Sequence, residues 1–465
     1  MAKILFFNPP SRKNVYLNTN VKVGAPSYPS LTLATLAGGL VRKHMVRIYD
    51  FDLDKNSPEK LFQEIKLFKP DIIASSAKTP DYLSVVEIMT EIKKKFPKIQ
   101  TIVGGVHVTA MPEEAIRTKC FDIIVLGEGD GVISEILSGT PLKNVLGIGY
   151  RTLSGKVVFT GRRNMIKNID SLSYPAWRLF KLDKYKNSRL SSRTNPVGLI
   201  ETSRGCSYKC NFCSKLIFGT YYRTKSVKRV VNEMEYMLDC GFREIHISDD
   251  SFTQNIDRAK DVCREIIKRK LKFNWSLING IRVNFVDEEF FHLAKKAGCW
   301  QTGFGIESGD QKVLNKIGKG TTLRQIVKAV KGAKKERIET FGFFIFGLSG
   351  ENENSLKKTI QFSKAIPLDI AKFDICIPYP GTEYYKDLDA QGKILTKEWD
   401  RYLCHQVEKP LFVHSTLKWN VIQKYYHKAF REYYLRPSYI LNRMLRDILR
   451  GDLFYDLKYF LQTKW

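Results

Sequence analysis

No stretch of this 465-residue chain is uninterruptedly apolar over the length that a membrane-spanning helix needs. The opening stretch, MAKILFFNPPSRKN, has a charged residue at position 3 and prolines at positions 9 and 10. This pattern is typical of a buried strand and not of a signal peptide. Nine cysteines in so long a chain do not indicate a disulfide framework. We therefore expect a cytoplasmic protein whose cysteines are reduced.

Acidic residues are scarce in comparison with basic ones. The 48 Asp and Glu residues face 76 Lys and Arg residues, which gives a formal net charge of +28. Such an excess predicts an anionic partner: nucleic acid, a membrane surface, or a small molecule that carries phosphate or carboxylate. The alternative is a lysine-rich composition without functional meaning. Because the lysines are spread along the chain and no nucleic-acid-binding module is visible, we do not expect a nucleic-acid partner.

The chain is too long for one hydrophobic core, and its hydrophobic fraction of 43% allows two or three packed domains. Over residues 1–145, five apolar strands alternate with amphipathic helices, which predicts a doubly wound, Rossmann-like α/β sheet. No G-x-G-x-x-G follows the first strand, which argues against a nicotinamide cofactor. A ligand of such a sheet binds beyond the carboxyl ends of the strands. The candidate binding residues there are Asn8, Ser75, Ser76, Lys78, Gly104, Gly105, His107, Gly127, Glu128 and Gly129.

Taken singly, each of these glycines could serve only as a turn. As a set, GGVHVTAMPEE and LGEGD resemble stretches of cobalamin-dependent radical enzymes. The resemblance implies a cobalamin that lies across the strand ends. The D-x-H-x-x-G motif of other cobalamin proteins is absent, which implies a cobalt without a protein ligand from below. His107 then either contacts the nucleotide tail of cobalamin or is a buried histidine satisfied by backbone groups.

Residues 146–190 read as a connector with a hairpin over GIGYRTLSGKVVFTG. A second alternating series of six strands and helices fills residues 191–385. Six parallel strands with crossover helices predict an open, partial (β/α)6 barrel of the TIM type, in which chemistry takes place at the carboxyl ends of the strands.

Three cysteines, Cys206, Cys210 and Cys213, follow the first strand of this barrel with the spacing C-x3-C-x2-C. A structural zinc site needs four ligands, so zinc would require a further, distant ligand. An iron–sulfur cube on three thiolates leaves one iron open to a small molecule. The spacing and Phe212 before the third cysteine resemble the signature of the radical S-adenosylmethionine (radical SAM) family. The resemblance implies a [4Fe–4S] cluster, S-adenosylmethionine, and an external electron donor such as flavodoxin or ferredoxin.

Further polar residues at the barrel strand ends resemble the S-adenosylmethionine pocket of this family. They are Asp249, Asp250, Arg282, Glu307 and Ser308. A carboxylate suits the ribose hydroxyls or the ammonium group, and arginine suits the carboxylate. The alternative for Asp249, Asp250 and Ser308 is to cap the helices that follow.

Residues 386–465 form a tail in which apolar and aromatic residues recur at helical spacing, with basic residues on the opposite faces. This predicts a helical cap over the barrel. The alternative is a basic, aromatic surface that touches a membrane or admits a hydrophobic substrate.

The resemblance covers nearly the whole chain and implies methylation of an unactivated carbon in a small or lipid-like molecule. In that reaction an adenosyl radical activates the substrate, cobalamin donates the methyl group, and a second S-adenosylmethionine replaces it. The first alternative is a radical cyclisation or rearrangement without methyl transfer, as in the porphyrin cyclase branch. A zinc-bearing, nucleic-acid-binding protein is the non-enzymatic alternative.

Overall fold

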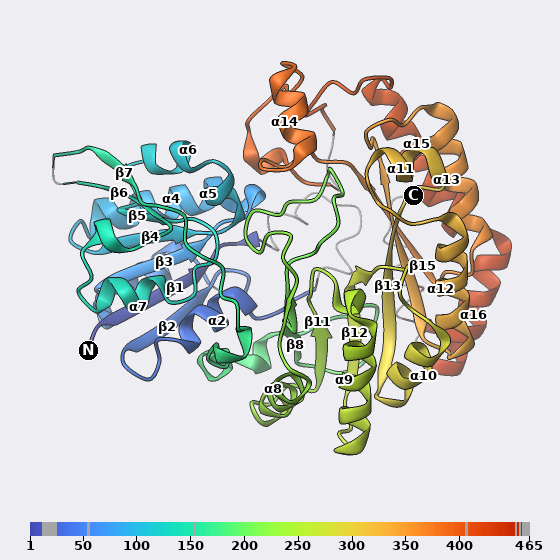
Figure 1. Ribbon diagram of the computed structural model, residues 1–465, viewed down its shortest axis with the longest axis horizontal. Coiled ribbons are helices and arrows are strands. Elements are labelled where there is room, and N and C mark those ends of the chain that lie inside the picture. The colour runs from blue at the N-terminus through green and yellow to red at the C-terminus, as the bar shows by residue number, and fades with distance from the viewer. Residues whose placement is uncertain are drawn as a thin grey trace.

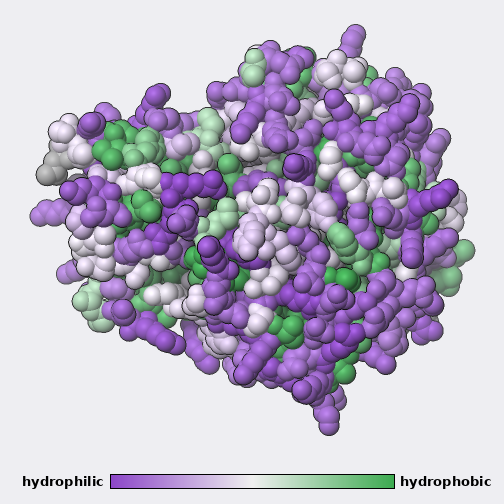
Figure 2. Space-filling view, viewed as in Figure 1, coloured by the Kyte–Doolittle hydropathy of each residue, from purple (hydrophilic) through white to green (hydrophobic). Residues whose placement is uncertain are grey.

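The computed structural model describes residues 1–11, 26–53, 56–152, 154–404, 408–451, 453–454 and 457. Two separate parallel α/β units lie side by side, with the first sheet on the left of Figure 1 and the second, curved sheet on the right. Hydrophilic side chains dominate the face of the molecule seen in Figure 2, and apolar ones are scattered among them. No helix in the described part of the chain is long and apolar enough to cross a membrane.

The first unit is a seven-stranded sheet with the order β2-β1-β3-β4-β5-β6-β7. The first five strands pair in parallel, and helices cover both faces, so the central residues of β1, positions 4–7, are completely enclosed. This confirms the predicted doubly wound sheet. Its elements are β1 Lys3–Asn8, α2 Leu31–Gly38, β2 Met45–Asp50, α3 Pro58–Phe68, β3 Ile72–Ser76, α4 Tyr82–Lys95, β4 Gln100–Gly104, α5 Val106–Ala110, α6 Pro112–Arg117, β5 Ile123–Val125, α7 Val132–Leu137, β6 Ile148–Arg151 and β7 Val157–Phe159.

The predicted hairpin of the connector is present, and it extends the first sheet. β6 pairs antiparallel with β5, and β7 pairs antiparallel with β6. Further along the connector, Trp177 is fully buried and its ring lies 5.2 Å from that of Phe242 in the second unit. The connector therefore packs against both units.

The second unit is a six-stranded parallel sheet with the order β15-β14-β13-β12-β11-β8, as predicted for a partial barrel. Each helix between two strands buries its apolar stripe on the convex side; α8, for example, encloses Val230, Met234 and Met237. The elements are β8 Val197–Ile200, β9 Ser203–Arg204, β10 Arg223–Thr224, α8 Val227–Asp239, β11 Glu244–Ile247, α9 Ile256–Lys268, β12 Asn274–Ile281, α10 Glu288–Lys296, β13 Cys299–Glu307, α11 Gln311–Lys316, α12 Leu323–Lys335, β14 Glu339–Phe346, α13 Glu353–Ala365 and β15 Ile370–Ile375.

The tail contains α14 (Glu383–Ala390), α15 (Trp419–Tyr434) and α16 (Pro437–Arg450). α15 packs beside α13 and β15 on the outside of the barrel (Figure 1), and it buries Ile422, Tyr425, Ala429 and Tyr433. The predicted helical cap is present in α15.

α16 differs from a helix that packs through its apolar face. Its apolar residues Leu441, Leu445 and Ile448 are 59%, 54% and 58% exposed. Its charged side instead faces the protein, where Arg446 pairs with the buried Glu339 at 3.2 Å. The apolar stripe of α16 is therefore turned towards solvent, and the opposite side attaches the helix through this ion pair and through Tyr439, whose ring lies 5.3 Å from that of Tyr433.

Candidate active site

The three cysteines lie on the loop that follows β8 and the short strand β9. Gly205 begins this loop with φ +82°, and a Cβ there would lie 2.5 Å from the carbonyl oxygen of Tyr221. Only glycine fits this close approach of two chain segments. Cys206 is buried, Cys210 is half-buried and Cys213 is exposed, so the loop presents its thiols progressively towards the open end of the barrel.

Glu307 ends β13 in a left-handed conformation with φ +65°, and its Oε1 lies 2.6 Å from Nζ of Lys319. Both side chains are almost fully buried. Gly305 makes room for the pair, because a Cβ at this position would lie 2.8 Å from both charged atoms. Glu307 was predicted from the sequence and Lys319 was not, because the only local signal of Lys319 is its position between two glycines in the stretch GKG.

Arg282 follows β12 and reaches the cysteine loop. Its guanidinium lies 3.2 Å from the centroid of the Tyr208 ring, and Nη1 lies 3.8 Å from Sγ of Cys210. Nη2 donates to the carbonyl oxygen of Lys319. Nε is buried and has no hydrogen-bond partner in the part of the chain that the structure describes, so one donor of a positioned cation is unused beside the thiols.

Asp249 is buried and supports the loop rather than facing an open space. Its two carboxylate oxygens accept bonds from the backbone N–H of Thr202 at 2.6 Å and from the hydroxyls of Thr202 and Ser203 at 2.5 and 2.6 Å. These bonds fix the exit of β8, so Asp249 acts through the position of the cysteine loop.

The two remaining candidates for the S-adenosylmethionine pocket occupy different environments. Asp250 is exposed, yet desolvation by surrounding protein raises the pKa of its carboxyl group, and Lys215 opposes that shift. The carboxyl group is therefore accessible, while the protein around it disfavours its charge. Ser308 is fully buried, and its hydroxyl lies 3.1 Å from that of Thr359 and accepts from the backbone N–H of Asp310. Direct contact of Asp249, Asp250 or Ser308 with S-adenosylmethionine stays a prediction.

The candidate cobalamin residues gather at one edge of the first sheet, because the carboxyl ends of its parallel strands coincide there. Ser75 pairs in register with Phe7 and Val103, and Ser76 with Gly104. Ser75 donates its hydroxyl to the carbonyl oxygen of Phe7 at 2.9 Å. Gly105 has φ +106°, and a Cβ there would lie 2.6 Å from a backbone oxygen. Small side chains, serine and glycine, therefore line this edge of the sheet.

The other candidates at this edge differ in accessibility. Asn8 donates to the carboxylate of Asp50 at 2.8 Å, and Lys78 is an exposed side chain. No atom of the described residues lies within 4 Å of the Cβ position at Gly127, whereas that position at Gly129 contacts Leu36 at 3.5 Å.

His107 is fully buried beneath this edge. Its ring lies 4.1 Å from that of Tyr82 and 5.0 Å from that of Trp399, and desolvation lowers its pKa to about 4. Nδ1 lies 3.3 Å from the hydroxyl of Thr79, and Nε2 has no partner among the described residues. The neutral ring thus joins the first unit to the 3₁₀ turn Trp399–Arg401, and its contact with cobalamin stays a prediction.

Buried ion pairs join the glycine-rich loop after β5 to the cysteine loop. Nη1 of Arg204 lies 2.8 Å from Asp130 and 3.7 Å from Glu128, and Nε lies 2.7 Å from Glu201. Arg223 pairs with the other oxygen of Glu128. Burial opposes the charge of Arg204, but the carboxylates outweigh burial and raise its pKa. Asp130, Arg204 and Arg223 were not predicted from the sequence, because their partners are distant along the chain.

A further close contact brings the two units together at their strand ends. The Cβ position at Gly381, after β15, lies 2.1 Å from Leu216 of the cysteine loop and 3.4 Å from Ala110, which follows β4. Three segments, one from the first sheet and two from the barrel, therefore meet at this glycine.

Comparison with known proteins identifies the family. The model of the radical SAM superfamily matches residues 200–363, and that of the B12 binding domain matches residues 20–137. An uncharacterized methyltransferase of Pyrococcus horikoshii is 33% identical over 97% of this chain and 98% of its own length. This chain belongs to the cobalamin-binding radical SAM enzymes. The anaerobic magnesium-protoporphyrin IX monomethyl ester cyclase of Rubrivivax gelatinosus is 26% identical over 95% of this chain and 81% of its own length.

Solved structures share the fold of this radical SAM enzyme. The methyltransferase TsrM from Kitasatospora setae, with tryptophan and an S-adenosylmethionine analogue bound, has a TM-score of 0.67 at 19% identity and covers 84% of this chain and 76% of its own. The radical enzyme OxsB, with aqua-cobalamin and S-adenosylmethionine bound, has a TM-score of 0.73 at 18% identity and covers 91% of this chain and 66% of its own.

The cofactors of the family are a [4Fe–4S] cluster, S-adenosylmethionine and cobalamin, and the residues of this chain fit them. The thiols of Cys206, Cys210 and Cys213 lie within eight consecutive positions of one loop. No three His, Cys, Asp or Glu side chains in the described ranges converge on a single metal ion. A cluster, in contrast, distributes its thiolates over different irons.

Arg282 and Glu307 fit S-adenosylmethionine. The Nε–H of Arg282, which has no partner among the described residues, suits the carboxylate of the ligand, and the carboxylate of Glu307 suits its ammonium group. The space at Gly127, where no described atom lies within 4 Å of the Cβ position, fits cobalamin.

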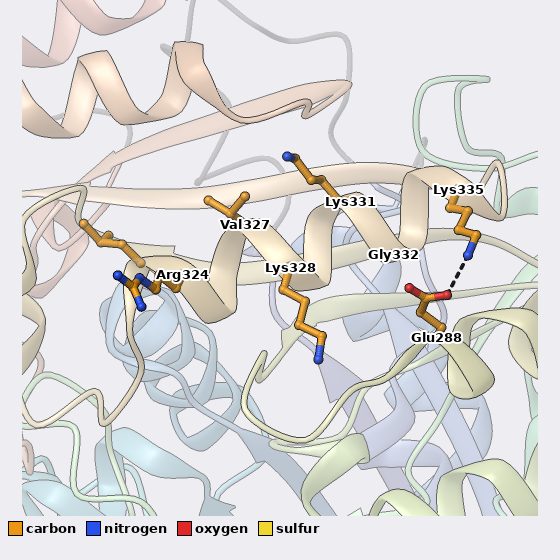
Figure 3. A pocket seen from close by; sticks show the side chains of 8 residues that line it. Glu288, Arg324, Val327, Lys328, Lys331, Gly332 and Lys335 are labelled. Carbon is orange, nitrogen blue, oxygen red and sulfur yellow. Dashed lines mark hydrogen bonds and ion pairs between the residues drawn. The ribbon is translucent and has the colours of Figure 1, made fainter.

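A hollow on the outside of the barrel lies away from this chemistry. Its volume is about 600 Å³, and it is lined by α12 and by Glu288 of α10. Figure 3 shows Lys328 and Lys331 pointing away from the helix and Lys335 paired with Glu288. Because α10 and α12 cover the outside of the barrel, the hollow that they line is separate from the cysteine loop.

Proposed function

We propose that this radical SAM enzyme methylates an unactivated carbon of a small molecule. The observation that carries the proposal is the meeting of the two cofactor edges: the glycine-rich edge of the B12 binding domain is joined to the cysteine loop by the ion pairs of Arg204 and Arg223. The name of the 33% identical relative, a methyltransferase, supports it.

When bound, the cluster and S-adenosylmethionine supply an adenosyl radical that takes a hydrogen atom from the substrate, and cobalamin supplies the methyl group. Residues of this chain position the cluster and S-adenosylmethionine. Cys206, Cys210 and Cys213 hold the cluster, and Arg282 and Glu307 orient S-adenosylmethionine by charge. A substrate bound where these two edges meet would be held in place beside both cofactors, and the two units would keep the radical from solvent.

Anaerobic turnover with S-adenosylmethionine that carries deuterium in its methyl group tests the proposal. We expect 5′-deoxyadenosine and S-adenosylhomocysteine in equal amounts, and a product whose mass increases by the labelled methyl group. Formation of 5′-deoxyadenosine with product, but without S-adenosylhomocysteine or label transfer, would show that methyl transfer is wrong.

Cyclisation or rearrangement is the second candidate, and the cyclase relative at 26% identity favours it. The same experiment separates the two, because a cyclase forms 5′-deoxyadenosine and an unlabelled product.

An external electron donor is required for the cluster, and we propose an acidic carrier such as flavodoxin or ferredoxin in the cytoplasm. The net charge of +28 favours association with an acidic protein. Reduction of the reconstituted cluster by flavodoxin should slow steeply as salt is added; a rate independent of salt would contradict charge-guided docking.

The exposed stripe of α16 supports a peripheral membrane contact. Its apolar residues Leu441, Met444, Leu445 and Ile448 recur at helical spacing on the solvent side. An apolar helical face beside a basic protein surface suits an anionic bilayer. The variant Leu441→Ser/Leu445→Ser/Ile448→Ser should co-sediment less with anionic phosphatidylglycerol vesicles than the unchanged chain. Equal, negligible sedimentation of both would count against the contact.

A further inference from the structure

The concave face of the barrel carries a charged residue that the cofactors do not use. Along β15, Phe373 points outward and packs on α15, where its ring lies 5.2 Å from Phe430 and 6.1 Å from Tyr433. Because side chains alternate along a strand, Lys372 and Asp374 point to the opposite, concave face.

Lys372 is exposed on this concave face. Desolvation by the surrounding protein lowers the pKa of its ammonium group, and the attraction of Asp374 only partly opposes this. The ammonium is therefore accessible, while the protein around it disfavours its charge. A cation in such a place is stabilised by an anionic ligand.

Two aromatic rings lie beside the ammonium. Nζ of Lys372 is 4.7 Å from the ring centroid of Phe341 and 5.3 Å from that of Phe343. The rings meet edge to face at 5.2 Å. Gly303 on β13 allows this arrangement, because a Cβ there would lie 2.4 Å from the Phe341 ring. A cation and an apolar wall are thus presented together.

The strand register places Lys372 and the two phenylalanine rings next to the candidate S-adenosylmethionine pocket. Lys372 pairs with Phe343, and Phe343 pairs with Gly305 on the next strand. Glu307 lies two positions beyond Gly305, at the carboxyl end of β13. The lysine and the rings therefore lie one side-chain layer deeper in the barrel than the pair Glu307–Lys319.

We propose that Lys372 binds a carboxylate or phosphate group of the substrate while Phe341 and Phe343 hold an apolar or aromatic part of it. This inference rests on the proposed function for the identity of the site and names the substrate class: an oxyanion attached to an apolar body. The oxyanion anchors the deep end of the substrate, so that its reacting carbon lies towards the strand ends.

Equilibrium binding of small probes to the reconstituted full-length enzyme tests the proposal. The probes are 1-naphthoate, 1-naphthyl phosphate and neutral 1-naphthylmethanol, titrated into the unchanged chain and into Lys372→Met. A charge-assisted contact predicts that the variant loses about 10- to 100-fold in affinity for at least one anionic probe and keeps its affinity for the alcohol. Lys372→Arg should retain most of the affinity for that probe.

Lys331→Met is the matched control, because this lysine lies on the convex side of the barrel (Figure 3) and should leave all three affinities unchanged. Formation of 5′-deoxyadenosine without substrate shows that each variant is folded and loaded. Equal loss for anionic and neutral probes in Lys372→Met, or no preference for anions in the unchanged chain, overturns the proposal. Because binding is read without turnover, failure of methyl transfer would not be mistaken for failure of this site.

Discussion

Glu351 provides a test of the electrostatics at the barrel mouth. The residue follows β14, is fully buried, and accepts bonds from the backbone N–H groups of Gly347 at 2.6 Å and Leu348 at 3.1 Å. Desolvation outweighs these bonds and raises the pKa of Glu351 from 4.5 to about 8. The carboxyl group is therefore neutral at neutral pH in the folded enzyme and ionised in the unfolded chain.

The sign of the effect follows from this difference. The folded-state pKa of Glu351 is higher than its unfolded-state pKa. The contribution of this residue to the unfolding free energy is therefore fully present below the unfolded pKa of 4.5 and is lost as the pH rises through about 8. Each pH unit in this window costs about 1.4 kcal/mol, so the unfolding free energy falls by about 2 kcal/mol between about pH 5.5 and pH 7. In Glu351→Gln the side chain is neutral in both states, and this loss disappears.

Thermal unfolding of the full chain at the two pH values measures the effect. About 2 kcal/mol corresponds to about 4 °C for a domain of this size, so the Tm of Glu351→Gln relative to the unchanged chain should rise by that amount from the lower to the higher pH. Glu353→Gln is the control, because Glu353 is exposed and its pKa is lowered by its bond from Tyr425; its Tm difference should not increase with pH. A Tm difference for Glu351→Gln that is the same at both pH values would refute the reasoning.

Four further outcomes are expected. Replacing all three loop cysteines by alanine should abolish the cluster in iron and sulfide assays after anaerobic reconstitution; a full cluster in that variant contradicts the assignment. The full chain should bind hydroxocobalamin in the micromolar range or tighter, and free passage of cobalamin through gel filtration would contradict this. Asp130→Asn removes one carboxylate partner of the buried Arg204 but leaves Glu201 in place, so stability should fall by about 2 kcal/mol and 5′-deoxyadenosine per product should rise; an unchanged ratio argues against a positioning role. Gly305→Ala should weaken S-adenosylmethionine binding by displacing Glu307 and Lys319, with unchanged cluster content; unaltered affinity counts against this pocket.

The sequence by itself determined the features that depend on near neighbours. The alternation of apolar strands and helices predicted both sheets, because helices and strands bury their apolar residues with different periods. The spacing of Cys206, Cys210 and Cys213 predicted the cluster loop, because its ligands lie within eight consecutive positions. Glu307 and Arg282 were identified because parallel strands bring their carboxyl ends to one edge.

Only the tertiary structure decided which distant residues meet. Arg204 and Asp130 are 74 positions apart, and neither carries a local pattern that indicates the other. The contact of His107 with Trp399, at 5.0 Å between ring centroids, joins segments almost 300 positions apart, and no local pattern indicates it. The apolar stripe of α16 predicted a buried face, but the other side of the helix contacts the protein through the ion pair of Arg446 with Glu339 and the packing of Tyr439 on Tyr433. A periodic pattern shows that a helix has two faces, but the partner available in three dimensions determines which of them is buried.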